Sequence, residues 1–193
     1  MTWLVAGLVV FLGAHSVRMF ADGFRSAQIA RLGANGWKGL YSLVSLAGLV
    51  LLVWGYGQAR QAPVVLWSPP LWMHYVTAAL TLLAFVLIAA AYVPGNRFKA
   101  AIGHPMVAGV KTWALAHLLS ASTLAGVVLF ASFFVWAILD FGSSRRRDRA
   151  AGTTYPPGST ARDALTCLVG AGAWVAFALW LHRPLIGIAP FGA

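Results

Sequence analysis

Long runs of apolar residues alternate with short polar segments along this chain. Five runs reach about 20 mostly apolar residues, the length that crosses the hydrocarbon core of a bilayer as a helix. They cover residues 2–20, 37–58, 71–93, 122–141 and 164–181. Lipid offers no partner to a free backbone amide, so each run must be helical there. The pattern predicts an all-α, polytopic transmembrane helical bundle.

A sixth apolar run, 105–119, is shorter and carries Lys111 and His117. At 1.5 Å per residue it covers only about 22 Å. It therefore needs shielding by neighbouring helices, or an extension through 100–104. With this run included, we expect about six spans in a single transmembrane domain over residues 1–193.

Two polar segments between the spans have a character of their own. Residues 22–33 mix apolar and basic side chains, which is typical of a short helix on the membrane surface that ends at Gly33; an irregular loop fits almost as well. Residues 143–157 are rich in Arg, Gly, Thr and Pro, and this composition predicts a mobile basic loop.

The composition is that of a membrane protein, and it indicates which partner the positive net charge attracts. Apolar residues make up 60% of the chain and charged residues only 9%, against about 25% charged in a typical soluble domain. The net charge of +10 comes from basic residues between apolar runs. Anionic lipid head groups at the cytoplasmic face are the partners that this arrangement favours, and we expect no nucleic-acid partner.

The distribution of positive charge predicts the orientation. With the N-terminus outside, most of the 14 Lys and Arg residues fall on the cytoplasmic side, which is the positive-inside pattern. The opposite side keeps Arg60 and Arg183. We therefore expect an N-out, C-out protein of the cytoplasmic membrane. The cytoplasmic basic residues are Arg18, Arg25, Arg31, Lys38, Arg97, Lys99, Arg145, Arg146, Arg147, Arg149 and Arg162.

Five histidines are the main candidates for chemistry. His15 and His117 lie clearly inside spans, whereas His74 and His182 fall near the outer interface. His104 precedes Pro105, and proline is favoured at the first position of a helix, so His104 is expected just outside a helix start.

The remaining composition limits what these histidines can bind. The chain has no glutamate and a single cysteine, Cys167, which disfavours structural zinc and di-iron sites. A b-type haem needs only one or two axial imidazoles, an apolar slot and cations for its propionates, and Arg18, Lys111 and Arg97 are suitable cations. The depths of His15 and His117 suit one iron, but His74 paired with His117 suits it equally well.

Three blocks in this order resemble the NnrU family of bacterial membrane proteins. They are Leu12-Gly-Ala-His15-Ser16, a middle block that runs from Gly103-His104-Pro105-Met106 to His117-Leu-Leu119, and Phe130-Ala-Ser132-Phe-Phe-Val-Trp136-Ala-Ile-Leu-Asp140. The resemblance implies a place in the bacterial inner membrane and a role in nitrite and nitric oxide metabolism during denitrification.

The same blocks are similar to the plastid zeta-carotene cis–trans isomerase, a b-haem protein of the same superfamily. That similarity implies axial ligation by His15 and His117, propionate contacts from Lys111 and Arg18, and redox-linked isomerisation of a polyene. The chain departs from the pattern at Ala114, where the isomerase has a cysteine, so a ligand switch involving a thiolate is not implied.

Two other classes of function stay open at this point. One is a non-catalytic accessory protein, without its own cofactor, that supports a respiratory complex. The other is a small-molecule carrier or proton path that uses Lys111 and the histidines, which the absence of buried acids and of an inverted repeat disfavours. The expected partners are the lipid bilayer, a hydrophobic small molecule, and a larger membrane complex or a second copy of the chain.

Overall fold

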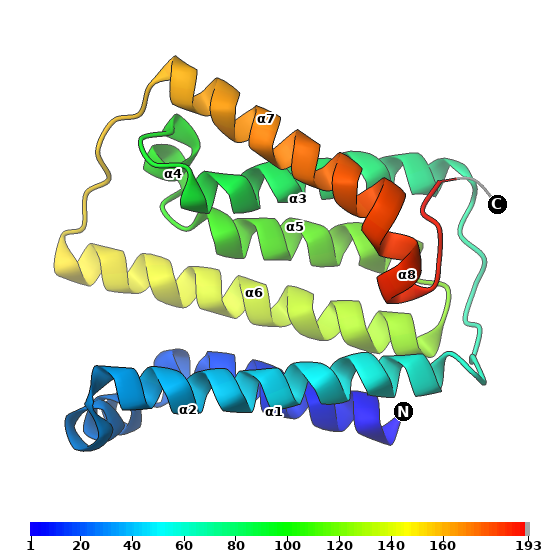
Figure 1. The fold of residues 1–193 in the computed structure, drawn as a ribbon, viewed down its shortest axis with the longest axis horizontal. Coiled ribbons are helices and arrows are strands. Elements are labelled where there is room, and N and C mark those ends of the chain that lie inside the picture. The colour runs from blue at the N-terminus through cyan, green and yellow to red at the C-terminus, as the bar shows by residue number, and fades with distance from the viewer. Residues whose placement is uncertain (192–193) are drawn as a thin grey trace. The chain divides into compact units, whose positions relative to one another are not determined.

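The computed structural model describes residues 1–191, so positions 192–193 of the expected domain lie outside it. The described chain is helical, with one isolated antiparallel bridge between Val65 and Thr123. Its elements (Figure 1) are α1 (Thr2–Phe20), α2 (Asp22–Ala59), α3 (Trp72–Tyr92), α4 (Arg97–Ile102), α5 (Pro105–Ser120), α6 (Leu124–Ala151), α7 (Thr160–Ala176), the π-helical turn η1 (Phe177–Leu181) and α8 (His182–Ile186).

The helices confirm the expected all-α membrane bundle. Within residues 1–191, five helices are long and apolar enough to cross a membrane: α1, α2, α3, α6 and the continuous stretch Thr160–Ile186. Helix α5 corresponds to the sixth expected run and has 16 residues, so it is short for a span, as the sequence indicated. The number of spans and the N-out, C-out orientation stay predictions.

Two boundaries differ from the expected ones. The helix expected over 22–33 is present, and α2 joins it to the next span across Gly33, whose backbone is non-helical (φ 73°, ψ 165°). The prediction of a mobile basic loop over 143–157 is wrong for residues 143–151, because α6 continues to Ala151. Arg147 donates hydrogen bonds to Ser143 and Ser144, both at 2.7 Å, and these bonds occupy serine hydroxyls that otherwise compete with the helix.

The chain forms two compact units. Unit 1 comprises residues 1–68 and 121–136, and unit 2 comprises residues 69–120 and 137–191. Helix α6 therefore contributes its first half to unit 1 and its second half to unit 2. Each unit is described by itself below.

Unit 1 is built on the close antiparallel packing of α1 against α2 (Figure 1). Small residues make this approach possible: a Cβ on Gly7 would lie 2.3 Å from the backbone nitrogen of Leu52, and one on Gly55 would lie 2.3 Å from that of Leu4. Glycine lets two helix backbones approach this closely in a membrane. The buried core that results consists of Leu4, Leu8, Leu52, Ala125 and Leu129.

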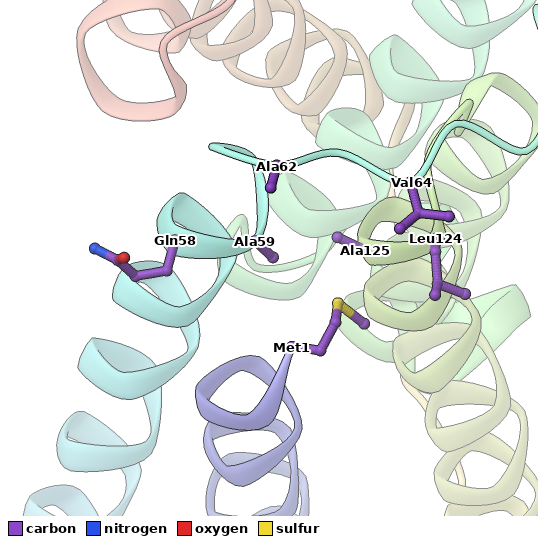
Figure 2. A pocket seen from close by; sticks show the side chains of 7 residues that line it. All are labelled: Met1, Gln58, Ala59, Ala62, Val64, Leu124 and Ala125. Atoms are coloured by element: carbon purple, nitrogen blue, oxygen red, sulfur yellow. The ribbon is translucent and has the colours of Figure 1, made fainter.

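A shallow pocket of about 140 Å³ lies in unit 1 between the start of α1, the end of α2 and the start of α6 (Figure 2). The connection after α2 closes one side, because Leu66 N–H donates to Ser122 O at 2.8 Å and Trp67 Nε1–H donates to Ala121 O at 2.7 Å. No ionisable side chain lines the pocket, so it offers no chemistry. Its lining is Met1, Gln58, Ala59, Ala62, Val64, Leu124 and Ala125.

Unit 2 is organised around α3, which packs against both α5 and α7 (Figure 1). Gly109 of α5 and Gly170 of α7 allow the close approaches: their Cβ atoms would lie 2.9 Å from Ala84 O and 2.6 Å from Val86 Cα, respectively.

The same two contacts within unit 2 are fixed by hydrogen bonds that involve side chains of α3. Thr77 Oγ1 donates to Ala116 O at 3.0 Å, and Trp174 Nε1–H donates to Thr81 Oγ1 at 2.9 Å. Both α5 and α7 are therefore held at a defined height on α3.

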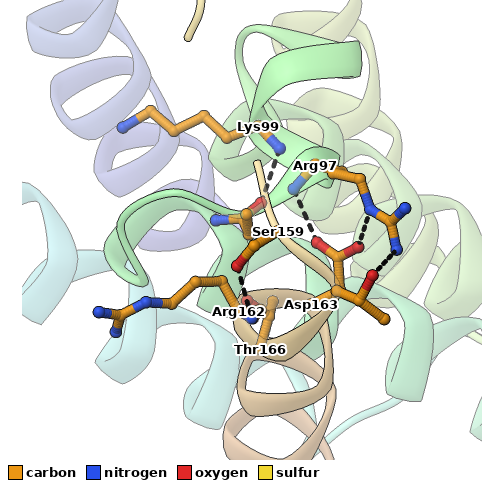
Figure 3. Close-up of polar contacts among 8 residues, drawn as sticks. Arg97, Lys99, Ser159, Arg162, Asp163 and Thr166 are labelled. Carbon is orange, nitrogen blue, oxygen red and sulfur yellow. Dashed lines mark hydrogen bonds and ion pairs between the residues drawn. The ribbon is translucent and has the colours of Figure 1, made fainter. Parts of the chain in front are cut away.

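At the other end of unit 2, the starts of α4 and α7 are joined by polar contacts (Figure 3). The Asp163 carboxylate accepts from Arg97 N–H at 2.7 Å and from Arg97 Nε–H at 2.5 Å. Ser159 caps α7 by accepting from Arg162 N–H. The contacts tie the start of α7 to the start of α4, and they give Asp163 a structural role.

Candidate functional site

His15 lies on α1 in unit 1 with a defined tautomer. Its Nδ1 is 2.7 Å from Phe11 O, four residues earlier in the same helix. A carbonyl oxygen only accepts, so Nδ1 carries the proton, and the neutral ring presents the lone pair of Nε2. Metal-ligating histidines are typically oriented by such a bond on the other ring nitrogen.

Aromatic rings surround the His15 imidazole within unit 1. The centroid of Phe11 is 4.3 Å from that of His15, the Tyr41 ring is 5.2 Å away, and the Trp136 ring stands edge-on at 6.0 Å. The side chain is half-buried. An apolar, aromatic wall of this kind suits a flat hydrophobic ligand.

Two buried polar atoms near His15 have no hydrogen-bond partner within residues 1–191, namely Trp136 Nε1 and Ser45 Oγ. Gly48 of α2 lies against Phe11 of α1, and the antiparallel register therefore places Ser45 at about the height of His15. Buried donors are nearly always paired in native proteins. Their presence here fits a bound group that supplies acceptor atoms.

His117 lies on α5 in unit 2 with the same tautomer as His15. Its Nδ1–H donates to Trp113 O at 2.9 Å, again four residues earlier in its own helix. The Trp113 ring stands 5.3 Å from the imidazole. Each of the two apolar runs carries a single histidine. In the structure, Nδ1 of each imidazole bonds to the backbone carbonyl four residues earlier in its own helix.

The other expected site residues are distributed as follows. The Lys111 ammonium lies 4.9 Å from the centroid of the Phe141 ring in unit 2, a cation–π contact. Arg18 is exposed in the last turn of α1. His74, the alternative ligand, is exposed on α3.

His15 and Arg18 thus both lie on α1 in unit 1, and Lys111 and His117 both lie on α5 in unit 2. The pairing of His15 with His117 joins one unit to the other and stays a prediction.

His104 takes part in a polar cluster that the sequence did not reveal. Its backbone carbonyl accepts from Ala108 N–H at 3.1 Å, which confirms its place at the start of α5. Its Nε2–H donates to the Asp148 carboxylate at 2.8 Å, and the Tyr155 hydroxyl donates to the same oxygen at 2.8 Å. Only tertiary folding joins residues this far apart in the sequence.

The Asp148 carboxyl lies in the charged extension of α6, beyond the apolar segment 122–141. The hydrogen bond from Tyr155, followed by the contact with His104, holds the pKa of this carboxyl below its usual value. Burial and the neighbouring carboxylate raise the pKa of the Tyr155 phenol. The cluster ties the connection after α6 to the start of α5.

His182 lies near the end of the continuous helical stretch that runs from α7 through η1 into α8. Its expected place near the outer interface stays a prediction, and the sequence did not reveal its hydrogen-bond partner. Its Nδ1–H donates to Ile188 O at 2.7 Å, and the Phe177 ring meets it edge-on at 5.8 Å. The π-helical turn shifts the register by about one residue, which sequence periodicity does not reveal.

Among residues 1–191, no three His, Cys or Asp side chains gather into a metal-binding group. The available donors are therefore single imidazoles, and those of His15, His117 and His182 are anchored through Nδ1. One or two imidazoles, an aromatic surround and nearby cations form the donor set that a b-type haem requires, and the residues present fit that group.

The fold and these features define a class: a polytopic α-helical membrane protein with anchored histidines inside its helices. The model of the NnrU protein family matches residues 3–190, nearly the whole chain, and the protein belongs to that family. The comparison with curated proteins found no match. The comparison with solved structures found none either.

Proposed function

We propose that this NnrU protein binds b-type haem between its transmembrane helices. The axial ligands are His15 and His117, and Lys111 and Arg18 neutralise the propionates. The observation that carries the proposal is the shared anchor of the two rings, in which Nδ1–H donates to a carbonyl of the same helix. The anchor orients the ring and raises the basicity of Nε2, which is the ligating atom.

The surroundings of the two rings support the same proposal. The unpaired donors Trp136 Nε1 and Ser45 Oγ suit the acceptor oxygens of a propionate or a water molecule beside it. The Lys111 ammonium lies within a membrane segment, 4.9 Å from the centroid of the Phe141 ring. A cation inside a membrane segment is costly without an anion, and a propionate supplies one.

When bound, the haem supplies one-electron chemistry at its iron. The protein holds the iron through its imidazoles, excludes water with aromatic side chains, and stabilises the propionates with cations. The proposal includes a redox-linked role in nitrogen-oxide metabolism or in polyene cis–trans isomerisation, in the bacterial inner membrane. Anionic lipids contact the arginines near the end of α6, and a hydrophobic small molecule is the substrate class.

The absorption spectrum of detergent-purified protein from haem-replete cells tests the proposal. We expect a Soret band in the wild type and its loss in the double variant His15→Ala, His117→Ala. The exposed His74→Ala variant is the matched control and retains the band. A wild-type protein without a Soret band refutes the proposal. In that case, in-cell function that survives the double replacement points to a membrane accessory protein without its own cofactor.

A further inference from the structure

One end of unit 2 holds most of the positive charge of that unit. Helices α5 and α7 both run antiparallel to α3, because from one contact to the next the residue numbers rise along α5 or α7 while they fall along α3. The end of α3 therefore lies beside the starts of α5 and α7, and the bond between His104 and Asp148 brings the end of α6 to the same place. The basic side chains at this end, which we call the basic end of unit 2, are Arg97, Lys99, Arg145, Arg146, Arg147, Arg149 and Arg162.

Acidic side chains balance only part of this charge. Unit 2 has three aspartates, so the seven basic side chains of the basic end leave four positive charges in excess. Two of the three carboxylates already accept hydrogen bonds within the protein: Asp163 from Arg97, and Asp148 from His104 and Tyr155. An excess of one sign at one end of a helical unit is the pattern that an anionic lipid surface complements.

The four arginines near the end of α6 differ in what their guanidinium groups contact. Arg147 donates from both terminal nitrogens to serine hydroxyls of its own helix, at 2.7 Å each. Arg145 is half-buried, and its Nη1 lies 3.1 Å from the position that a Cβ on Gly103 would take. Arg146 and Arg149 are exposed. Two of these side chains are therefore held against the protein, and two are open to a partner.

A similar division is found at the starts of α4 and α7. Arg97 binds the Asp163 carboxylate, whereas Arg162 is exposed and extends away from that carboxylate (Figure 3). Lys99 is half-buried, and its ammonium donates to Ala91 O at the end of α3, at 3.5 Å. Arg162 thus adds a third exposed guanidinium group to the basic end of unit 2.

We propose that the basic end of unit 2 is a docking surface for anionic phospholipids, whose headgroup phosphates are held by Arg146, Arg149 and Arg162. Guanidinium groups bind phosphate oxygens through paired, charge-assisted hydrogen bonds. All three arginines lie at the ends of helices that are long and apolar enough to cross a membrane, which is where headgroups lie. The inference rests on the lipid contact in the proposed function and names its residues, and it does not depend on haem. Because the lipid binds the folded chain, it stabilises the fold.

The test is the thermal midpoint of the protein in vesicles, followed by tryptophan fluorescence. We expect the midpoint in phosphatidylcholine vesicles to rise by several degrees when phosphatidylglycerol is mixed in. The rise should shrink in about 1 M salt, where the screening length is about 3 Å. Arg149→Gln should lose much of the rise, and the triple variant Arg146→Gln, Arg149→Gln, Arg162→Gln should lose all of it.

Two matched controls separate directed contacts from a diffuse attraction to net charge. Arg147→Gln removes the same charge from the same helix, but its guanidinium group already binds serines. Arg183→Gln removes one charge from α8, at the opposite end of unit 2. Both variants should keep the rise. Each rise is the difference between two midpoints of one variant, so a general loss of stability cancels.

Three results overturn the proposal. The first is a wild-type midpoint that does not respond to phosphatidylglycerol. The second is a loss of the rise in Arg149→Gln that is no larger than the loss in either control. The third is an equal rise when inorganic phosphate is added to phosphatidylcholine vesicles, because it shows a site for a free anion. The Soret band is recorded on the same samples, so the haem proposal stands or falls separately.

Discussion

Replacing Gly7 with alanine tests whether backbone contact between α1 and α2 holds unit 1 together. The added Cβ would lie 2.3 Å from Leu52 N and 2.6 Å from Leu52 Cα. Both are backbone atoms, so no side-chain rotation relieves the overlap. Ordinary contacts begin at 3.4 Å, and the helices must therefore separate locally by about 1 Å.

The expected cost follows from two opposing effects. Overpacking of a close interface costs about 1–3 kcal/mol, while replacing a helical glycine with alanine stabilises the helix by about 0.5–1 kcal/mol. The net loss is about 1–2 kcal/mol, because separation also loosens the contacts of Leu4 and Leu8, which are 0% and 5% exposed. For a chain of this length, each kcal/mol lowers the thermal midpoint by about 2–4 °C.

Thermal unfolding in detergent, followed by intrinsic tryptophan fluorescence, measures the effect. Gly13→Ala is the matched control, because Gly13 is on the same helix and its Cβ would meet nothing within 4 Å. We expect Gly13→Ala to match or exceed the wild-type midpoint and Gly7→Ala to fall several degrees below it. A Gly7→Ala midpoint at or above that of Gly13→Ala would refute the packing argument.

Two further predictions concern unit 2. Gly170→Ala should lower the thermal midpoint, because its Cβ would lie 2.6 Å from Val86 Cα, whereas Gly172→Ala on the same helix should not, because its Cβ would meet nothing within 4 Å; equal midpoints would contradict this. The second prediction concerns Asp148, whose carboxyl pKa in the folded protein is lowered by the hydrogen bond from Tyr155. The ionised carboxylate therefore stabilises the fold at pH values above the usual carboxyl pKa of about 3.9. This stabilisation is lost as the pH falls through the pKa of Asp148 in the folded protein. The midpoint of Asp148→Asn should therefore fall below that of the wild type near neutral pH, and the gap should close below about pH 4; a gap independent of pH would argue against the charged contact.

Part of the candidate site was accessible from the sequence. His15 and His117 stand out because a polar side chain within an apolar run is costly and needs a role. The tautomer that both rings share was not accessible, because it depends on the helix that brings a carbonyl to Nδ1. The hydrogen-bond partners of His182 and His104 were not accessible either, because the backbone after a π-helical turn supplies the first and a residue distant in sequence supplies the second.

The sequence by itself determined that this is a helical membrane protein and approximately where its helices run. Hydrophobic length is a local property, and lipid accepts no other backbone structure from such segments. Helix pairing was decided by the tertiary structure, because every span is apolar. The close fit at glycines such as Gly7 and Gly170, together with hydrogen bonds such as that from Trp174 to Thr81, selects each neighbour. A tertiary contact likewise anchors α6 in the basic segment, where Asp148 accepts a hydrogen bond from His104, 44 residues earlier in the chain.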